Sequence, residues 1–165
     1  MSRKSENGQK QSLTILDKDY LEWVKQLSSR YKSYLIKASV HINSEQLKFY
    51  YSVGKDIFEK QIDNKYGTKF YASLSRDLRK LLPDAEGLTE GNLRYAKRFY
   101  QLYSDPKKLF PQVAEELYPQ IFPQVAEELP KVPWGHHRLL IDKFSDNPPK
   151  ALFVVGQIVE SWNRG

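Results

Sequence analysis

The feature that most constrains the fold is a pair of short apolar patterns with helical spacing, one on each side of a turn, around residues 74–100. In the first pattern, apolar residues recur every three or four positions and therefore fall on one side of a helix. These residues are Phe70, Leu74, Leu78, Leu81 and Leu82, and those predicted to lie elsewhere on the helix are Arg76, Asp77, Arg79 and Lys80. Pro83 lacks a backbone donor, so the first helix is predicted to end before it.

The second pattern follows a turn that contains Asp84 and Gly87. Thr89 is predicted to cap the next helix, which would start near Glu90, because its hydroxyl can accept from first-turn amides; Leu88 would pack on Leu93. The predicted apolar face consists of Leu93, Ala96, Phe99, Tyr100 and Tyr103. We therefore predict an all-α, multi-helix domain containing a helix-turn-helix-like pair, although the connection is longer than in the familiar helix-turn-helix.

The polar side of the second helix carries the side-chain types that bind DNA. Arg and Lys neutralise phosphates or reach guanine, while Asn and Gln can pair with adenine in the major groove. The candidate DNA-binding residues on this helix are Asn92, Arg94, Lys97, Arg98 and Gln101. Arg76, Arg79 and Lys80 on the first helix are further candidates, for backbone contacts. The alternative is a merely solvated face, because spacing alone does not distinguish the two.

The basic charge is unevenly distributed along the chain, whose formal net charge is +6. Residues 1–37 and residues 65–98 each contain 8 Lys and Arg against 4 Asp and Glu, whereas residues 105–130 contain 2 against 5. This distribution fits polyanion binding by the N-terminal region and the helix pair. The total of +6 is ordinary for a protein of this size, so the charge by itself does not establish DNA binding.

Residues 1–16 are predicted to form a flexible basic arm, whose Arg3, Lys4 and Lys10 either contact DNA or are solvated. Helices are predicted over about 19–40 and about 44–61, with a cap at Asn43 or Ser44 in the second. The first of these carries a long apolar stripe: Tyr20, Trp23, Val24, Leu27, Tyr31, Tyr34, Leu35 and Ala38. This stripe predicts either core packing or a homodimer through Tyr20, Trp23, Leu27, Tyr31 and Tyr34. In the second helix, Gly54 would permit close approach of a neighbour.

The octapeptide FPQVAEEL occurs twice, at 110–117 and at 122–129. Each copy is predicted to place Pro at the first position of a short helix. Two copies are too few for a solenoid, which needs about three or more units. We interpret residues 105–130 as an acidic duplicated insert that lengthens a loop and is functionally neutral, with a peptide-like surface for a protein partner as the alternative.

Five longer segments resemble the N-terminal domain of the YhcG-like proteins, a bacterial family. They are INSEQLKFYYSVGKDIFEKQ, YASLSRDLRKLL, GLTEGNLRYAKRFYQLY, VPWGHHRLLIDK and ALFVVGQIVESW, in the family's order over about residues 17–164. The resemblance implies an all-helical domain that binds double-stranded DNA, followed in full-length relatives by a metal-dependent PD-(D/E)xK nuclease. Residues 17–165 would correspond to the first part, with the C-terminal nuclease domain absent. The alternative is a helical oligomerisation or adaptor module that binds a nuclease or restriction-modification partner and has no DNA affinity.

We expect no catalytic site, metal site or cofactor in the chain, and therefore no enzyme activity. There is no cysteine, and the adjacent His136 and His137 would point to different sides of a helix, so one of them is predicted to bond a backbone carbonyl while Trp134 anchors the helix start. Pro83-Asp84 matches two letters of the nuclease motif, but no acidic-x-Lys strand follows it. No apolar run approaches membrane-spanning length, so a cytoplasmic location is expected.

Overall fold

The computed structural model describes residues 15–164, with side chains described for residues 15–32 and 44–161. Within these residues all regular structure is helical, which confirms the predicted all-α fold. The α-helices are α2 (Lys18–Glu59), α3 (Ile62–Tyr66), α4 (Phe70–Leu81), α5 (Glu90–Tyr103), α6 (Pro106–Leu109), α7 (Tyr118–Glu128), α8 (Trp134–Phe144) and α9 (Pro148–Arg164). Two 3-10 helices, η1 (Glu115–Leu117) and η2 (Leu129–Lys131), flank α7. The predicted basic arm, with Arg3, Lys4 and Lys10, lies outside the described residues apart from its last two positions.

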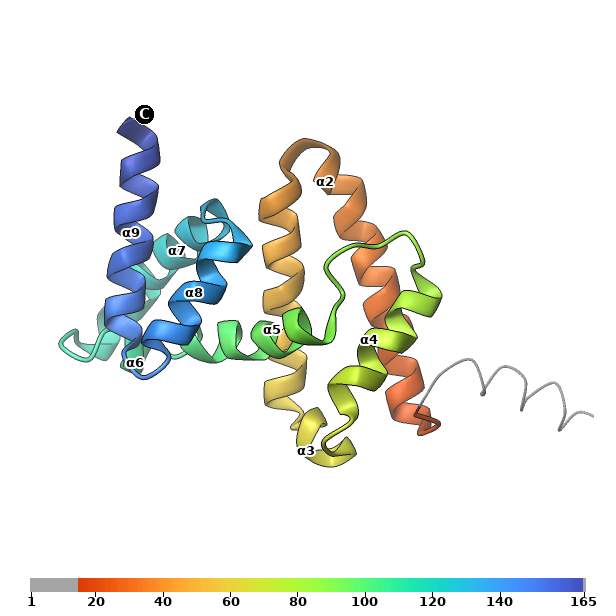
Figure 1. Cartoon of the computed structure of the whole chain (residues 1–165). Coiled ribbons are helices and arrows are strands. Elements are labelled where there is room, and N and C mark those ends of the chain that lie inside the picture. Colours follow the sequence, from red (N-terminus) through yellow and green to blue (C-terminus); the bar gives the residue numbers. More distant parts are fainter. Residues whose placement is uncertain (1–14, 165) are drawn as a thin grey trace, which may run out of the picture.

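Helix α2 contains 42 residues and folds back on itself, as Figure 1 shows at the top of the molecule. A straight helix of this length would separate Trp23 from Asp56 by about 50 Å. Instead, the Trp23 indole donates a hydrogen bond of 2.9 Å to Asp56, and the Tyr31 and Phe49 ring centroids are 5.1 Å apart. The two arms therefore pack side by side, as two separate helices would, although the backbone stays helical through residues 43–44, where a cap was predicted.

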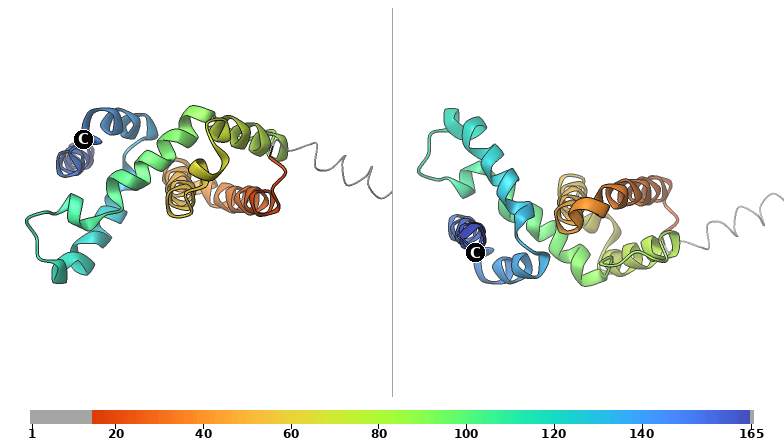
Figure 2. Two further views of the ribbon diagram at one scale, coloured as in Figure 1. Left: turned by 90° about the horizontal axis from the view of Figure 1, so that it is seen from below. Right: turned by 90° about the horizontal axis from the view of Figure 1, so that it is seen from above.

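Helix α5 lies between two groups of helices. Figure 2 shows it crossing from α2, α3 and α4 on one side to α6, α7, α8 and α9 on the other. Its most extensive packing is against α2, and it also contacts α4, α8 and α9. Gly54 makes the α2 contact possible, as predicted, because a Cβ atom there would collide with the Ala96 carbonyl of α5. The Thr89 cap is confirmed, since its hydroxyl accepts from the Asn92 amide at 3.1 Å.

The aromatic stripe of the first α2 arm is buried in the core of its own chain. The Tyr20 hydroxyl donates to the buried Asp77 at 3.0 Å, and Trp23 stacks on Phe70 with centroids 6.0 Å apart. Leu27 and Tyr31 are buried as well. A homodimer through these four side chains is therefore incompatible with the folded chain, which corrects that prediction, and the Tyr34 side chain lies outside the described residues.

Two side chains of α4 lie on other sides of the helix than predicted. Asp77 was predicted to be outside the apolar face but is fully buried, because it faces α2 and accepts from Tyr20. Leu81 was predicted to be on that face but is 36% exposed. The helix ends at Leu81, and the following residue, Leu82, occupies the core position instead.

Residues 105–130 are not the acidic loop that was predicted, because they form α6, η1, α7 and most of η2. Pro111 lies in a turn and Pro123 lies inside α7, so neither proline begins a helix as expected. Pro119 takes that early position in α7 instead. The second octapeptide copy contributes Val125 and Leu129 to the core. No helix within the described residues is both long and apolar enough to cross a bilayer.

Candidate nucleic-acid interface and an apolar groove

Helix α5 exposes only a narrow strip of its surface. The predicted apolar residues of this helix are all buried, together with Leu102. Glu90, Gly91, Arg94 and Gln101 are exposed, and Lys97 and Arg98 are partly exposed. These positions recur at helical spacing, so they form one line along the helix. A nucleic acid could therefore meet α5 only along this line, flanked by the neighbouring helices α4 and α8.

Two of the predicted DNA-binding residues of α5 are engaged inside the molecule. The Asn92 amide donates to the Gly87 carbonyl at 3.1 Å, and its oxygen accepts from the Trp134 indole at 2.9 Å. Lys97, whose side chain is only 20% exposed, pairs with Asp63 of α3. These contacts hold α5 to the preceding turn, to α8 and to α3. Asn92 and Lys97 therefore fix the position of α5.

The Asp63 carboxylate is a junction between three elements. Besides the Lys97 ammonium, it accepts a hydrogen bond of 3.1 Å from the Tyr71 hydroxyl. Burial by itself would raise the pKa of Asp63, but the bonds from Lys97 and Tyr71 outweigh it and lower the pKa overall. Burial also raises the pKa of the Tyr71 phenol, and the neighbouring carboxylate adds to this effect. The Asp63 carboxylate is therefore ionised at neutral pH and forms its ion pair with Lys97.

Arg94 and Arg98 remain at the surface in exposed ion pairs. Arg94 pairs with Glu90 at 2.9 Å, and its guanidinium carbon lies 4.6 Å from the centre of the Tyr71 ring. Arg98 pairs with Asp142 of α8 at 3.1 Å. Their side chains are 48% and 42% exposed, about twice the value for Lys97. Exposed pairs of this kind contribute only roughly 0–1 kcal/mol, so they exchange partners easily.

A third arginine, Arg138 of α8, joins this surface and was not predicted. Its guanidinium carbon lies 4.7 Å from the centre of the Tyr95 ring, and that of Arg98 lies 5.2 Å from the same centre. The Tyr95 hydroxyl donates to Asp142 at 2.7 Å, which ties α5 to α8. Arg138 is 40 or more residues from the α5 cations, so sequence spacing carried no signal for it. We call the set Arg94, Arg98, Arg138, Tyr71 and Tyr95 the arginine–tyrosine strip.

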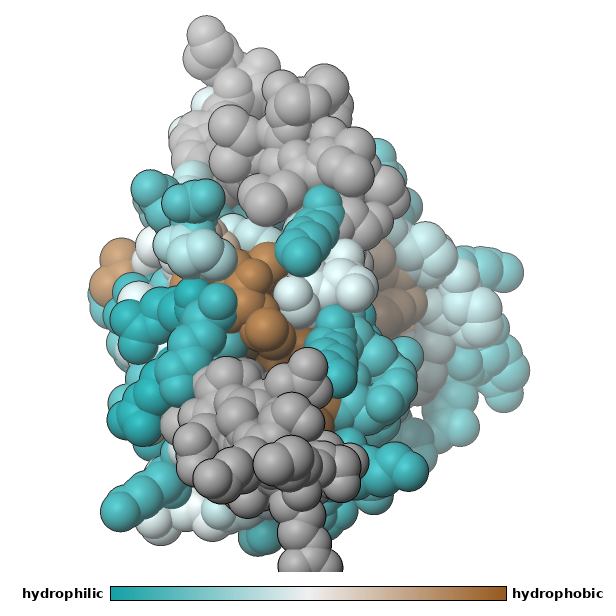
Figure 3. Space-filling model, turned by 90° about the vertical axis from the view of Figure 1, so that its right-hand side faces the viewer, coloured by the Kyte–Doolittle hydropathy of each residue, from teal (hydrophilic) through white to brown (hydrophobic). Residues whose placement is uncertain are grey.

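The remaining candidates lie at the ends of this strip or on α4. Gln101 is exposed on α5. Arg76 and Lys80 are exposed and form no ion pair with a described residue, whereas Arg79 donates to the Ser75 carbonyl at 3.3 Å. Where Figure 3 shows residues in colour on the side of the molecule on which α4 lies, most of the surface is hydrophilic, with a smaller hydrophobic area at the centre. The structure thus leaves these four side chains accessible.

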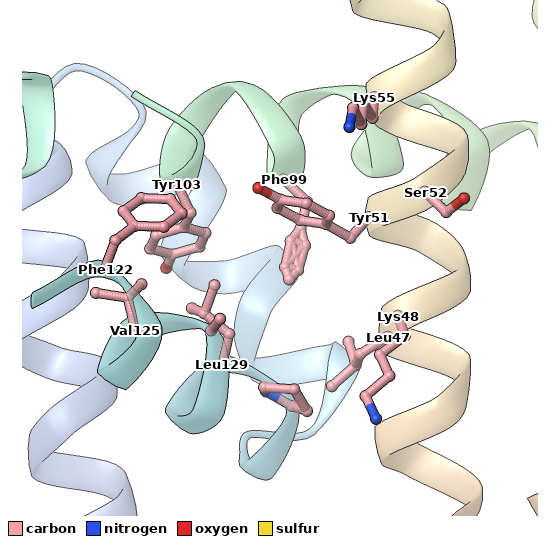
Figure 4. Close-up of a pocket in the computed structure, with 12 residues that line it drawn as sticks. Leu47, Lys48, Tyr51, Ser52, Lys55, Phe99, Tyr103, Phe122, Val125 and Leu129 are labelled. Atoms are coloured by element: carbon pink, nitrogen blue, oxygen red, sulfur yellow. The ribbon is translucent and has the colours of Figure 1, made fainter. Parts of the chain in front are cut away.

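An apolar groove with a volume of about 500 Å³ lies between the second arm of α2, helix α5 and the α7–η2 segment (Figure 4). Leu47 and Tyr51 form the α2 wall, Phe99 lies on α5, and Phe122 and Val125 form the opposite wall. The volume is within the range typical of ligand pockets. Two lysines, Lys48 and Lys55, are also in the lining. Burial, followed by the electrostatic effect of the Tyr100 phenol, raises the pKa of the Tyr51 phenol to about 12. Tyr51 therefore stays protonated.

His137 lies behind this groove and has a structural environment, as predicted for one of the two histidines. It is fully buried, its ring stacks on Phe99 with centroids 4.8 Å apart, and Nε2 is 2.8 Å from the Leu129 carbonyl oxygen. A carbonyl can only accept, so Nε2 carries the proton. Burial lowers the pKa of His137 to about 4, which keeps the ring neutral. Trp134 starts α8 and stacks on Tyr50, as expected for an anchor.

The described side chains include no group of three or more His, Cys, Asp or Glu residues placed to hold a metal ion. Pro83 and Asp84 lie in the turn after α4, on no strand. A family model described as the DUF1016 N-terminal domain matches residues 26–165. Comparisons with curated proteins and with solved structures find no match.

Proposed function

The chain belongs to the family of the DUF1016 N-terminal domain, the family that the YhcG-like resemblance indicated, and from this premise we propose that it is the DNA-binding module of a PD-(D/E)xK nuclease. The observation that carries the proposal is the arginine–tyrosine strip. Its three guanidinium groups come from α5 and α8 and lie against two tyrosine rings, so their positions are constrained while they remain accessible.

The strip can take up phosphate because its carboxylate partners are exposed. A DNA phosphate would replace Glu90 beside Arg94 and Asp142 beside Arg98, and the exposed ion pairs cost little to break. Each phosphate contact releases counterions from the DNA, which favours binding at low salt. The tyrosine rings beneath limit the motion of the arginines, so less conformational entropy is lost on binding.

The side chains have different roles in this proposal. Arg94, Arg98 and Arg138 bind phosphates, with Arg76 and Lys80 of α4 extending the contact along the backbone. Gln101 is the side chain free to reach a base edge. Asn92 and Lys97 act indirectly, by holding α5 in place through Gly87, Trp134 and Asp63.

We further propose that this chain binds DNA without cutting it, so that the nuclease chemistry belongs to another domain or partner. The purified chain should leave plasmid DNA intact in the presence of Mg²⁺ or Mn²⁺. Cleavage that persists through purification and is removed by a chelating agent would contradict this part of the proposal.

The alternative function is a helical oligomerisation or adaptor module without DNA affinity. The apolar groove is the observation that favours it, since open apolar surfaces mark protein contacts as well as ligand sites. The two functions differ in their response to salt, because an apolar interface releases no condensed counterions.

The test is a fluorescence-anisotropy titration of duplex DNA over a range of salt concentrations. The five proposed phosphate contacts should cost about three decades of affinity over a fourfold rise in salt. The triple variant Arg94→Ala, Arg98→Ala and Arg138→Ala should bind more than about tenfold more weakly and reduce the salt slope by about three.

The matched control replaces three exposed lysines elsewhere, Lys25, Lys108 and Lys131, with Ala. None of them pairs with a described residue, and the net charge changes by the same amount. This control should keep most of the affinity and most of the salt slope. Equal losses in both triple variants would mean that net charge rather than the strip binds DNA, and no binding at low salt would favour the adaptor.

A further inference from the structure

The two octapeptide copies differ in how much apolar surface they bury. In the second copy, Val125 and Leu129 are buried. In the first copy, Val113 is only partly buried and Leu117 is 44% exposed. Phe110 and Phe122 are both partly buried and packed against the core, so the two copies differ at Val113 and Leu117, which the first copy leaves less covered than Val125 and Leu129.

The second copy already shows what the octapeptide packs against. Its apolar residues at positions 1, 4 and 8, Phe122, Val125 and Leu129, form one wall of the apolar groove and face the wall made by α2 and α5, as Figure 4 shows. Positions 1, 4 and 8 fall on one face of a helix. The first copy carries the same three side chains at the same spacing, so it can form the same face.

We propose that the apolar groove binds the Phe110–Leu117 segment of a second copy of this chain. Charge complementarity supports this occupant, because Lys48 and Lys55 lie in the groove lining while Glu115 and Glu116 are exposed on the segment. Lys48 pairs with Glu45 and Glu115 pairs with Lys107, so Lys55 and Glu116 are the members without an ion pair to a described residue. Apolar side chains would enter the groove, and the two glutamates would meet the two lysines at its edge.

The segment cannot easily reach the groove of its own chain. Leu117 is followed directly by Tyr118, the first residue of α7, and α7 is itself a wall of the groove. The chain would have to reverse direction with no residues left for a turn, unless the start of α7 unwound. A second molecule has no such restriction. Because segment and groove are different surfaces, the contact closes into a symmetric dimer if it is reciprocal and otherwise forms an open chain.

The test is sedimentation equilibrium of the chain over a range of concentrations, with charge reversals on the two surfaces. Lys55 and Glu116 are exposed and form no ion pair with a described residue, so Lys55→Glu and Glu116→Lys should fold normally. Wild type should gain mass with concentration, and each single reversal should weaken association more than about tenfold because like charges then meet. The double variant should restore association, since the pair is re-formed in the opposite sense.

Two controls make the test specific. Leu117→Lys should also abolish association, whereas Leu16→Lys, which changes another exposed leucine (55% exposed), should not. A synthetic FPQVAEEL peptide should compete with association, and FPQVAKKL should not. The triple variant of the arginine–tyrosine strip should associate like wild type, so a failure of this proposal is distinguishable from a failure of DNA binding.

The proposal is overturned if wild type stays monomeric at high micromolar concentration, or if Glu116→Lys and Leu117→Lys leave association unchanged. Binding of the FPQVAEEL peptide to a chain that stays monomeric would also overturn it, in favour of another protein that carries a similar acidic segment.

Discussion

The two copies of FPQVAEEL have the same eight residues and different structures. In the first copy, residues 110–114 form a turn and irregular backbone, and only Glu115–Leu117 is a 3-10 helix. In the second copy, residues 122–128 belong to α7 and Leu129 begins η2. The last leucine is 44% exposed in the first copy and 5% exposed in the second.

The difference teaches that packing, rather than the octapeptide itself, decides its conformation. A helix as short as α7 is marginal in water without tertiary contacts. The second copy follows Pro119 at the start of α7 and packs towards α2, α5 and α8, where His137 bonds the Leu129 carbonyl. The first copy precedes α7, and of its apolar side chains only Phe110 packs against the core, so no α-helix forms there.

The largest expected effect is a difference in the free energy of unfolding between variants of Leu129 and of Leu117. Leu129→Ala should lower the free energy of unfolding by about 2–5 kcal/mol, because it removes a buried side chain and leaves a cavity. Leu117→Ala should change it by less than about 0.5 kcal/mol, as is usual for surface substitutions. Urea unfolding followed by circular dichroism measures both values. Equal losses in the two variants would mean that both copies are packed.

A second expected effect concerns the pH dependence that His137 gives to the second copy. Its pKa is about 4 in the folded chain and near 6.5 when unfolded, so between these values the unfolded chain binds more protons. The free energy of unfolding should therefore fall as pH falls from about 6.5 to about 4, at up to about 1.4 kcal/mol per pH unit. Unfolding measured across this range should show the slope.

The neighbouring histidine provides the control for this pH effect. His137→Phe should flatten the slope between about pH 6.5 and 4, whereas His136→Gln, at an exposed position, should preserve it. Hydrogen exchange at mildly acidic pH should rise in α7 and η2 more than in residues 110–117, because the bond from His137 reaches only the second copy. A slope that survives His137→Phe would assign the effect to other groups.

The smallest expected effect is the change in stability when the proline of each copy is replaced by alanine, and its sign should differ between the two copies. Pro123 lies inside α7, where proline removes a helical hydrogen bond, so Pro123→Ala should stabilise the chain by about 1–2 kcal/mol. Pro111 lies in a turn, so Pro111→Ala should destabilise the chain by up to about 1 kcal/mol through a freer unfolded state. Thermal unfolding compares the two, and a loss in both would show that Pro123 is fitted to its site.

The predictions for α4 and α5 succeeded where the interactions are local. The start of α5 at Glu90 and its cap at Thr89 depend on neighbouring residues, and both are confirmed. Asp77 and Leu81 were placed wrongly because their environment depends on α2, and on the point where α4 gives way to Leu82. Spacing within one helix cannot show which parts of it a distant helix will cover.

The candidate site shows the same division. Its cations on α5 were found from the sequence, and the accessible ones, Arg94 and Arg98, are among them. The engagement of Lys97 by Asp63 and the approach of Arg138 to Tyr95 join residues more than 30 positions apart, so only the folded chain reveals them. DNA binding by these residues stays a prediction.

By itself, the sequence determined the helical class of the chain, its family, the end of α4, the start of α5 and the apolar face of α5, because periodicity, capping and proline act over a few residues. Only the tertiary structure decided that α2 folds back on itself, that its aromatic stripe is internal, and that one FPQVAEEL copy is largely α-helical while the other is mostly turn and irregular backbone. The physical reason is that burial energy depends on which surfaces meet, and an eight-residue segment contains no information about the surface it will meet.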